Sequence, residues 1–144
     1  MSFPRVSPKE AHDLVTAEGY VFVDVRSIPE FEQGHPEGAF NVPLNHMGPS
    51  GMTPNADFLA VMQANFPKDT KLVVACKAGG RSMKAAQTLV GAGYTTVVDQ
   101  RAGWSGAADP FGKIAEPGWS AAGLPTATTP ASGHTYAELL EKKA

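Results

Sequence analysis

Short apolar runs alternate along this chain with stretches in which hydrophobic residues recur every three or four positions. The runs have the length of strands, and their continuous apolar character is typical of strands that are buried on both faces of a parallel sheet. We expect strands at residues 5–6, 20–25, 39–42, 71–76 and 94–99. Strands that alternate with helices in this way indicate an α/β fold with a parallel sheet and right-handed crossovers.

The periodic stretches predict helices, and some of them begin with clear capping signals. Ser7 is followed by a proline at the first helical position and, three residues later, by Glu10, which together make a capping box. Gly19 is expected to end this helix. Thr53 and Pro54 are interpreted in the same way, as the cap and first turn of a later helix. Further helices are expected over residues 29–33, 83–90 and 134–142.

The regular pattern weakens after Trp104. Residues 109–117 contain a glycine and two prolines and are expected to form an inserted loop, and residues 121–133, rich in Ala, Thr, Pro and Gly, an extended arm. We therefore divide the chain into a domain at residues 1–125 and a C-terminal arm with a short helix at residues 126–144. A chain of 144 residues fits one such domain and is too short for two in tandem.

Composition excludes several classes of function. With 42% hydrophobic and 18% charged residues the chain is typical of a globular protein, and its net charge of −2 gives no electrostatic reason to expect binding to nucleic acid or to a membrane surface. The single cysteine excludes an internal disulfide, and the four dispersed histidines offer no metal-ligand spacing, so we expect no metal and no cofactor.

The chain also lacks the usual signals for export. No run is apolar for long enough to span a bilayer, and the first residues lack the apolar core of a secretory signal. We therefore expect a cytoplasmic protein, although the mature form of an organellar protein would look the same.

The candidate chemistry lies at the single cysteine, Cys76. An apolar run stops at this residue, and a loop with two glycines, Gly79 and Gly80, leads from it into the next helix. This order places the thiol at the carboxyl end of a strand, facing the first amides of a helix, where free N–H groups and the helix dipole attract anions. Lys77 and Arg81 add positive charge. The loop is therefore a candidate cradle for a thiolate and for an anionic donor bound to it.

The spacing Cys-x-x-Gly-x-Arg after a strand resembles the active-site loop of the rhodanese (thiosulfate sulfurtransferase) family. Three further segments match that family in the same order. Val23–Arg26 is similar to its Asp-x-Arg strand end, residues 30–43 to its block that ends Gly-Ala-x-Asn-x-Pro, and Gly103-Trp104 to its late Gly-Trp pair. The resemblance covers roughly residues 5–125 and implies a single rhodanese-like domain, with a five-stranded parallel sheet flanked by helices on both faces.

The resemblance also implies a reaction. Cys76 would be the nucleophile that takes a sulfur atom from thiosulfate or a persulfide donor, holds it as a persulfide, and passes it to cyanide or to a thiol such as thioredoxin or glutathione. The amides of residues 77–81 would stabilise the persulfide. Lys77 would neutralise the donor, and its charge favours thiosulfate or a persulfide over mercaptopyruvate. Both a monomer and a homodimer are compatible with the sequence.

Each site residue is assigned an expected role. Arg81 either lines the cradle or pairs with Glu30 or Asp24, and pairing is favoured because a guanidinium suits a carboxylate. Ser82 either caps the helix or reaches the persulfide, and capping is favoured. The resemblance implies that Asp24 and Arg26 hold neighbouring loops, and Glu30 is placed in the same supporting set. The catalytic residue is thus Cys76, and the substrate-binding residues are Lys77, Ala78, Gly79, Gly80, Arg81 and Ser82.

Two other functions remain open at this point. A cysteine phosphatase also holds a thiolate in an amide cradle with an arginine, but it places five residues between them, whereas only residues 77–80 separate Cys76 from Arg81. A non-catalytic binding module, or one that relays sulfur, is the second alternative. Formation of thiocyanate from cyanide after loading with thiosulfate would separate a sulfurtransferase from both.

Overall fold

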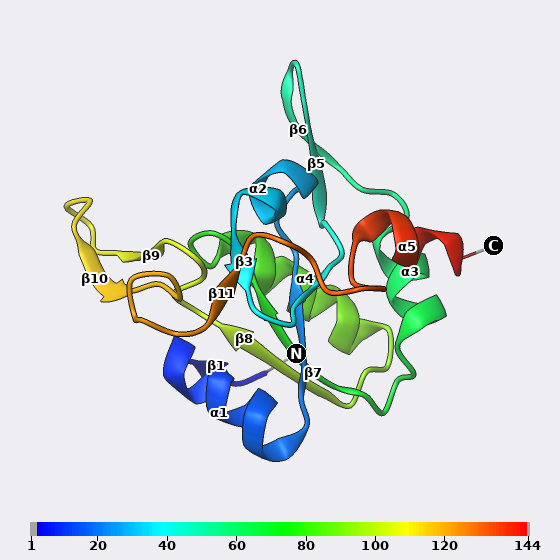
Figure 1. The fold of residues 1–144 in the computed structure, drawn as a ribbon, viewed down its shortest axis with the longest axis horizontal. Coiled ribbons are helices and arrows are strands. Elements are labelled where there is room, and N and C mark those ends of the chain that lie inside the picture. Colours follow the sequence, from blue (N-terminus) through cyan, green and yellow to red (C-terminus); the bar gives the residue numbers. More distant parts are fainter. Residues whose placement is uncertain (1–2, 144) are drawn as a thin grey trace.

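The computed structural model describes residues 3–143 and contains the expected parallel sheet (Figure 1). Its strand order is β1-β8-β7-β2-β4, and every neighbouring pair is parallel. The strands are β1 (Arg5–Val6), β2 (Val21–Asp24), β4 (Phe40–Asn41), β7 (Lys71–Ala75) and β8 (Thr96–Gln100). All five overlap the runs predicted from the sequence, so the α/β fold class and the five-stranded parallel sheet are confirmed.

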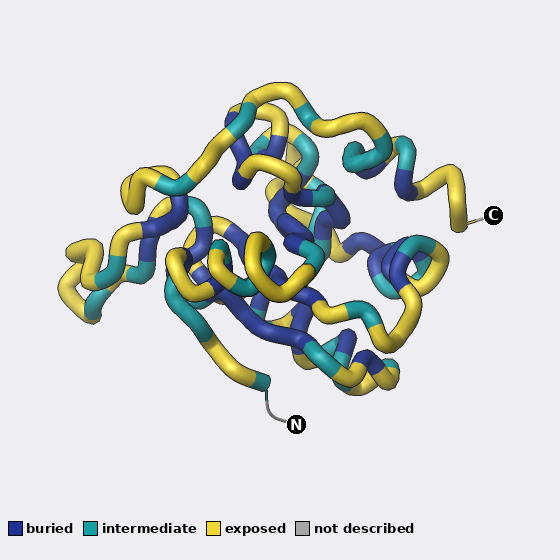
Figure 2. Tube along the Cα trace, turned by 60° about the horizontal axis from the view of Figure 1, so that its bottom comes forward, coloured by how far each residue is buried: buried dark blue, intermediate teal, exposed yellow. Residues whose placement is uncertain are grey.

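Helices cover both faces of this sheet. They are α1 (Pro8–Glu18), α2 (Ile28–Gln33), α3 (Phe58–Asn65), α4 (Gly80–Gly91) and α5 (Tyr136–Glu141). One buried cluster joins α3, α4 and α5 to Val23 and Val74, and the other joins α1 and α2 to Phe22 and Val73. Consecutive strand residues belong to different clusters because side chains along a strand point to opposite faces in turn. Figure 2 shows this buried layer through the middle of the molecule.

The predicted capping box at the start of α1 is present. The Glu10 amide donates to Ser7 Oγ at 3.1 Å, and the Ser7 amide donates to Glu10 Oε1 at 2.9 Å. Gly19 ends the helix in the left-handed conformation, with φ of 72°. None of the helices described in residues 3–143 is long and apolar enough to cross a membrane.

The start of α3 differs from the prediction. Thr53 and Pro54 do not cap a helix but lie in a strand, β6 (Gly51–Pro54), which pairs antiparallel with β5 (Asn45–Gly48). α3 begins only at Phe58. The expected cap was wrong because every residue of β6 is exposed, so that no alternation of apolar and polar residues marks the strand.

Asn55 is the physical reason why the helix starts late. Its buried side chain donates to Pro43 O at 2.9 Å and to Tyr136 Oη at 3.1 Å, and its Oδ1 accepts from the Asp57 amide at 3.0 Å. These contacts fix the turn between β6 and α3. They involve segments far away in the sequence, and such tertiary contacts override local helix propensity.

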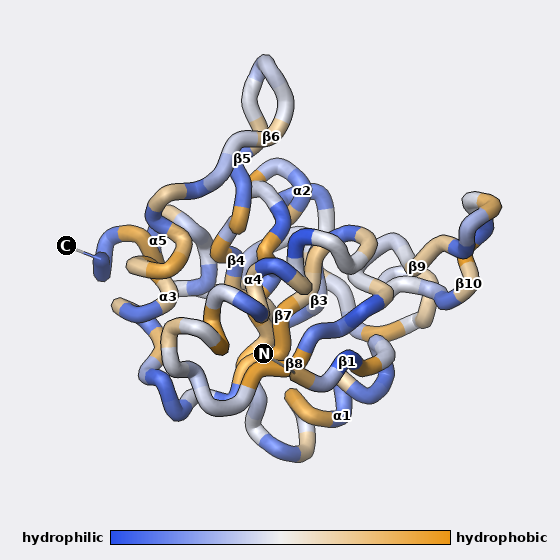
Figure 3. Tube along the Cα trace, turned by 180° about the vertical axis from the view of Figure 1, so that it is seen from behind, coloured by the Kyte–Doolittle hydropathy of each residue, from blue (hydrophilic) through white to orange (hydrophobic). Residues whose placement is uncertain are grey.

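A second hairpin occupies the segment that was expected to be a loop. β9 (Gly106–Ala108) pairs antiparallel with β10 (Ile114–Pro117). At its tip the Asp109 carboxylate accepts from the amides of Phe111 and Lys113 at 2.9 and 3.0 Å. Both hairpins project from the body of the protein in Figure 1, and Figure 3 shows hydrophobic colour in the middle of the sheet and again near β10.

The C-terminal arm packs on the domain that precedes it. β11 (Thr126–Ala127) pairs antiparallel with β3 (His35–Pro36), and α5 places Tyr136 and Leu139 in the same buried cluster as α3. α5 lies within the helix predicted at residues 134–142. The domain boundary at residue 125 stays a prediction, because β11, which follows it, pairs with β3, which precedes it.

Candidate active site

Cys76 directly follows β7, and its sulfur lies against the start of α4. The Gly79 amide donates to Sγ at 3.0 Å. Because α4 begins at Gly80, the sulfur is close to the free amides and to the positive end of the helix dipole. The predicted order of strand, loop and helix is therefore observed. Cys76 is only 2% exposed, so solvent reaches little of it.

Ser82 links the thiol to the loop backbone. The Cys76 thiol lies 3.6 Å from Ser82 Oγ, and that hydroxyl donates to Gly79 O at 3.3 Å. A hydroxyl rotates freely, so the same proton can turn toward the sulfur when the sulfur is negatively charged. Ser82 does not cap the helix, because Gly79 occupies the cap position. The favoured capping role was therefore wrong, and the alternative of a contact with the sulfur fits the geometry.

Gly79 has a conformation that requires glycine. Its φ of 100° lies in the left-handed region. A Cβ at this position would lie 2.6 Å from Arg101 O and 3.3 Å from Arg5 Nη2. Any larger residue would therefore push the loop away from its neighbours and change the direction in which the Gly79 amide points.

The turn after β8 holds the cysteine loop through the backbone. The Trp104 amide donates to Cys76 O at 2.8 Å, and the Ser105 amide donates to Lys77 O at 2.9 Å. Gly103 packs directly on the same carbonyls, and a Cβ there would collide with them. The Gly-Trp pair that was noted in the sequence thus fixes the position of the nucleophile.

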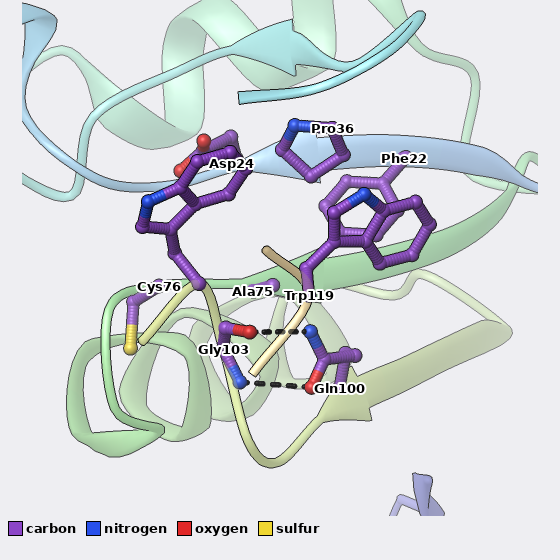
Figure 4. A pocket seen from close by; sticks show the side chains of 9 residues that line it. Phe22, Asp24, Pro36, Ala75, Cys76, Gln100, Gly103 and Trp119 are labelled. Atoms are coloured by element: carbon purple, nitrogen blue, oxygen red, sulfur yellow. Dashed lines mark hydrogen bonds between the residues drawn. The ribbon is translucent and has the colours of Figure 1, made fainter. Parts of the chain in front are cut away.

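Gln100 shapes this turn and was missed in the sequence. Its Oε1 accepts from the amides of Ala102 and Gly103, both at 2.8 Å, and its Nε2 donates to Gly103 O at 3.0 Å (Figure 4). Gln100 is fully buried at the end of β8. The only sequence signal for Gln100 was its position as a polar residue at the end of an apolar run. That position does not reveal which backbone groups its side chain would bind.

The cavity beside Cys76 in Figure 4 does not provide access for a substrate. It is too narrow to admit a water molecule. The rings of Phe22 and Trp119 form part of its wall, and the Cys76 sulfur points away from both of them. The cavity is therefore a gap in the packing of the core, and the substrate has to approach the sulfur from another side.

Arg81 points back to α2 and pairs with Glu30, which was the favoured prediction. Its Nη1 and Nη2 donate to Glu30 Oε1 and Oε2 at 2.7 and 3.1 Å. Ser27 adds a second set of donors to the same carboxylate. Partial burial raises the pKa of Glu30, but the hydrogen bonds from Arg81 and Ser27 outweigh burial and hold it at about 2. The bond to Glu30 in turn raises the pKa of Arg81. Both groups are therefore charged at neutral pH.

Asp24 and Arg26 form a buried ion pair that ties together three loops. Arg26 Nη2 lies 2.7 Å from Asp24 Oδ2 and also donates to Gly34 O at 2.6 Å. The guanidinium carbon of Arg26 lies 4.9 Å from the centre of the Trp104 ring, within the range of a cation–π contact. Asn41 Nδ2 donates to the carbonyls of both paired residues. With side chains only 2% and 4% exposed, the pair is placed to support loops rather than to meet a substrate.

Lys77, Ala78 and Gly80 lie at the exposed rim of the loop. Lys77 makes no ion pair with the described residues. It lines a cleft of about 220 Å³, and the other lining residues are Arg26, Glu30, Gln33, Trp104 and Ser105. Binding of a substrate by the rim residues stays a prediction. Within residues 3–143 no cluster of three or more His, Cys, Asp or Glu side chains could hold a metal ion.

Comparison with known proteins shows which family this sequence resembles. The family model described as "Rhodanese-like domain" matches residues 7–109. Thiosulfate sulfurtransferase 16, chloroplastic, from Arabidopsis thaliana is 42% identical over 121 residues, which cover 84% of this chain and 90% of that protein. The senescence-associated protein DIN1 of Raphanus sativus is 38% identical over 99 residues, and the match spans 69% of this chain and about half (54%) of that protein.

A solved structure gives the same result for the fold. The crystal structure of Rv0390 from M. tuberculosis superimposes with a TM-score of 0.73 at 28% sequence identity, and it covers 89% of this chain and all (100%) of that chain. The family model covers most of the sheet, the Cys76 loop and the turn that holds it. This chain belongs to the rhodanese-like domain family.

Proposed function

We propose that this protein is a sulfurtransferase in which Cys76 carries one sulfur atom from thiosulfate, or from a persulfide donor, to cyanide or a thiol. The observation that carries the proposal is the Gly79 amide, 3.0 Å from Sγ at the start of α4. Backbone amides and a helix N-terminus stabilise negative charge on sulfur. The relative named thiosulfate sulfurtransferase, with 42% identity, supports the same assignment.

The reaction consists of two displacements on sulfur. The Cys76 thiolate attacks the outer sulfur of thiosulfate, the S–S bond of the donor breaks, and sulfite leaves with the electron pair. This step leaves the persulfide anion Cys76–S–S⁻. Cyanide then attacks its outer sulfur, Cys76 leaves as a thiolate, and thiocyanate is released. No net oxidation occurs, and no general base is needed once the thiol has lost its proton.

In this mechanism the cations near the loop have separate roles. Arg81 and Arg26 are held by Glu30 and Asp24, so they position the loop and do not bind the donor. Lys77 is exposed and unpaired among the described residues, and it is therefore the group that would attract the negative charge of thiosulfate. Ser82 would donate its hydroxyl proton to the charged sulfur.

The test of this function is the mass of the intact protein after incubation with excess thiosulfate and desalting. We expect a gain of about one sulfur atom (~32 Da) through the covalent intermediate, and cyanide should remove it as thiocyanate. Cys76→Ser should keep the circular dichroism spectrum and gain no mass. A gain in Cys76→Ser, or none in the unaltered protein, would contradict the proposal.

A binding role without catalysis is the second candidate, and one observation favours it. Cys76 is 2% exposed, and a nucleophile has to be reached by its substrate. A binding module would gain no sulfur and produce no thiocyanate. A cysteine phosphatase would instead cleave an aryl phosphate, but the four residues 77–80 make a shorter loop than that chemistry uses.

We propose a reducing compartment as the place of action, in the cytoplasm or inside an organelle. A single cysteine that has to stay reduced between turnovers supports it. The name of the Arabidopsis relative places that protein in the chloroplast, which favours the organellar form of the proposal.

A further inference from the structure

A methionine of the β5–β6 hairpin contacts the arginine of the cysteine loop. Arg81 Nη1 donates to Met52 Sδ at 3.6 Å, and the same nitrogen donates to Glu30 Oε1 at 2.7 Å. The contact joins the hairpin, which projects from the molecule in Figure 1, to the first turn of α4. A thioether is only a weak acceptor, so Arg81 would bind a stronger acceptor at this position more tightly.

The sulfur of Met52 is also accessible to small oxidants. Met52 is 41% exposed, whereas Met62 lies in the core and is fully buried. Exposed thioethers are commonly oxidised to the sulfoxide, which is polar and chiral at sulfur. A peroxide in solution therefore reaches Met52 but not Met62.

The residue opposite Met52 provides an internal reference. Met47 pairs with Met52 across the two strands, so the two side chains lie on the same face of the hairpin. Met47 is 50% exposed and thus at least as accessible as Met52. Within residues 3–143, only the sulfur of Met52 accepts a hydrogen bond from a charged side chain. A difference in reactivity in favour of Met52 would therefore come from Arg81 and not from exposure.

We propose that Met52 is an oxidation site directed by Arg81, at which a peroxide converts the thioether to the sulfoxide with its oxygen on the side of the guanidinium. A lone pair of Sδ attacks one oxygen of the peroxide, the S–O bond forms and the O–O bond breaks. The other oxygen leaves with the electron pair and takes up the proton of the first, so that hydrogen peroxide ends as water. Sulfur is oxidised and the peroxide is reduced by the same amount.

Arg81 would both favour this step and bind its product. The oxygen on sulfur becomes negatively polarised as it forms, and a charged N–H donor within reach stabilises it. Nη1 carries two N–H groups, so it can donate to the sulfoxide oxygen and to Glu30 Oε1 together. Oxidation would thus tie the β5–β6 hairpin more firmly to α4, and a methionine sulfoxide reductase would reverse the change.

The test follows each methionine in a variant that lacks the other. Trypsin releases residues 27–68 as one peptide, so Met47→Leu reports on Met52 and Met52→Leu reports on Met47. Leucine has a volume close to that of methionine, and both variants should fold. After brief treatment of the folded proteins with dilute hydrogen peroxide, the peptide should gain one oxygen (~16 Da) several-fold faster at Met52 than at Met47.

The stereochemistry at sulfur gives a second measurement. The reductases MsrA and MsrB each remove one epimer of the sulfoxide. We expect one of them to reduce most of the oxidised Met52 peptide, and each to reduce about half of the oxidised Met47 peptide. In urea Arg81 is no longer held beside the sulfur. Peptide fragmentation should then show equal rates and equal epimers at both residues.

The proposal is overturned if folded Met52 gains oxygen no faster than Met47, if the two reductases remove equal shares from Met52, or if the preference persists in urea. It does not depend on the proposed sulfur transfer. The same mapping in Cys76→Ser should therefore give the same preference, and loss of the preference in that variant would also overturn it. Failure of the proposed function has a different signature, since the unaltered protein would then gain no sulfur from thiosulfate.

Discussion

At the scale of single residues, the site separates cations that hold the loop from a cation that is free to meet a substrate. The guanidinium of Arg81 is engaged by Glu30 and that of Arg26 by Asp24, each through charged hydrogen bonds. The ammonium of Lys77 has no such partner among the described residues. The loop can therefore attract an anion without giving up the ion pairs that shape it.

Lys77→Ala should raise the KM for thiosulfate several-fold at low ionic strength and much less at high ionic strength. An exposed charge acts over about 30 Å at 0.01 M salt but only about 8 Å at 0.15 M, so screening removes its contribution. The kcat should change little, because the charge acts on binding of the donor. Steady-state kinetics at two salt concentrations measure both constants. Lys84→Ala, an exposed lysine on α4, is the control, and an unchanged KM in Lys77→Ala would show that this lysine is only solvated.

The contribution of the Glu30–Arg81 ion pair to stability can be measured as a function of pH, because Glu30 is its titratable partner. Its pKa is about 2 in the folded protein, against an ordinary value of 4.5, so its contribution to stability is fully present above about pH 4.5 and is lost as the pH falls toward 2. Glu30→Gln should therefore lower the free energy of unfolding by about 2 kcal/mol at neutral pH. The difference between the two proteins should shrink below pH 4.5 in urea titrations. A difference that stays constant down to pH 3 would mean that Glu30 acts through packing alone.

At the scale of elements, the C-terminal arm is held on the domain by Leu139, which is buried as fully as the core residues of the domain. Leu139 is 1% exposed and belongs to the cluster of α3 and α4, whereas its neighbour Leu140 is 36% exposed. Leu139→Ala should lower the free energy of unfolding by about 2–4 kcal/mol, the usual cost of truncating a buried leucine. Leu140→Ala should cost less than about 0.5 kcal/mol. Chemical denaturation measures both, and equal effects would show that α5 is not packed on the domain.

The elements also differ in how far the sequence predicts them. The parallel strands and the Cys76 loop could be predicted because the local sequence identifies them: the strands are continuous apolar runs, and the loop contains glycines directly after such a run. β6 is exposed along its whole length and β10 nearly so, and neither shows the alternation of a half-buried strand. The two hairpins were therefore expected to be a loop and the start of a helix.

At the scale of the whole molecule, the residues that position the site depend on distant partners. Gln100 holds the turn that carries Trp104, and Asn55 joins the β5–β6 hairpin to Tyr136 on α5. Their residue types are compatible with many other roles, so no local pattern could reveal these ones. The roles of Arg81 and Ser82 were open for the same reason, and only the positions of Glu30 and Gly79 decide between the alternatives.

The short edge strand β1 places Arg5 next to the loop that carries the nucleophile. Arg5 Nε lies 2.8 Å from Asp99 Oδ2, and Arg5 Nη2 lies 3.3 Å from the position that a Cβ on Gly79 would take, while the Gly79 amide donates to the sulfur. Substitution of Arg5 is therefore expected to change the packing around the backbone that carries this amide. Changes at Arg5 in this edge strand could therefore be used to tune the reactivity of Cys76 while every residue of the active-site loop stays unchanged.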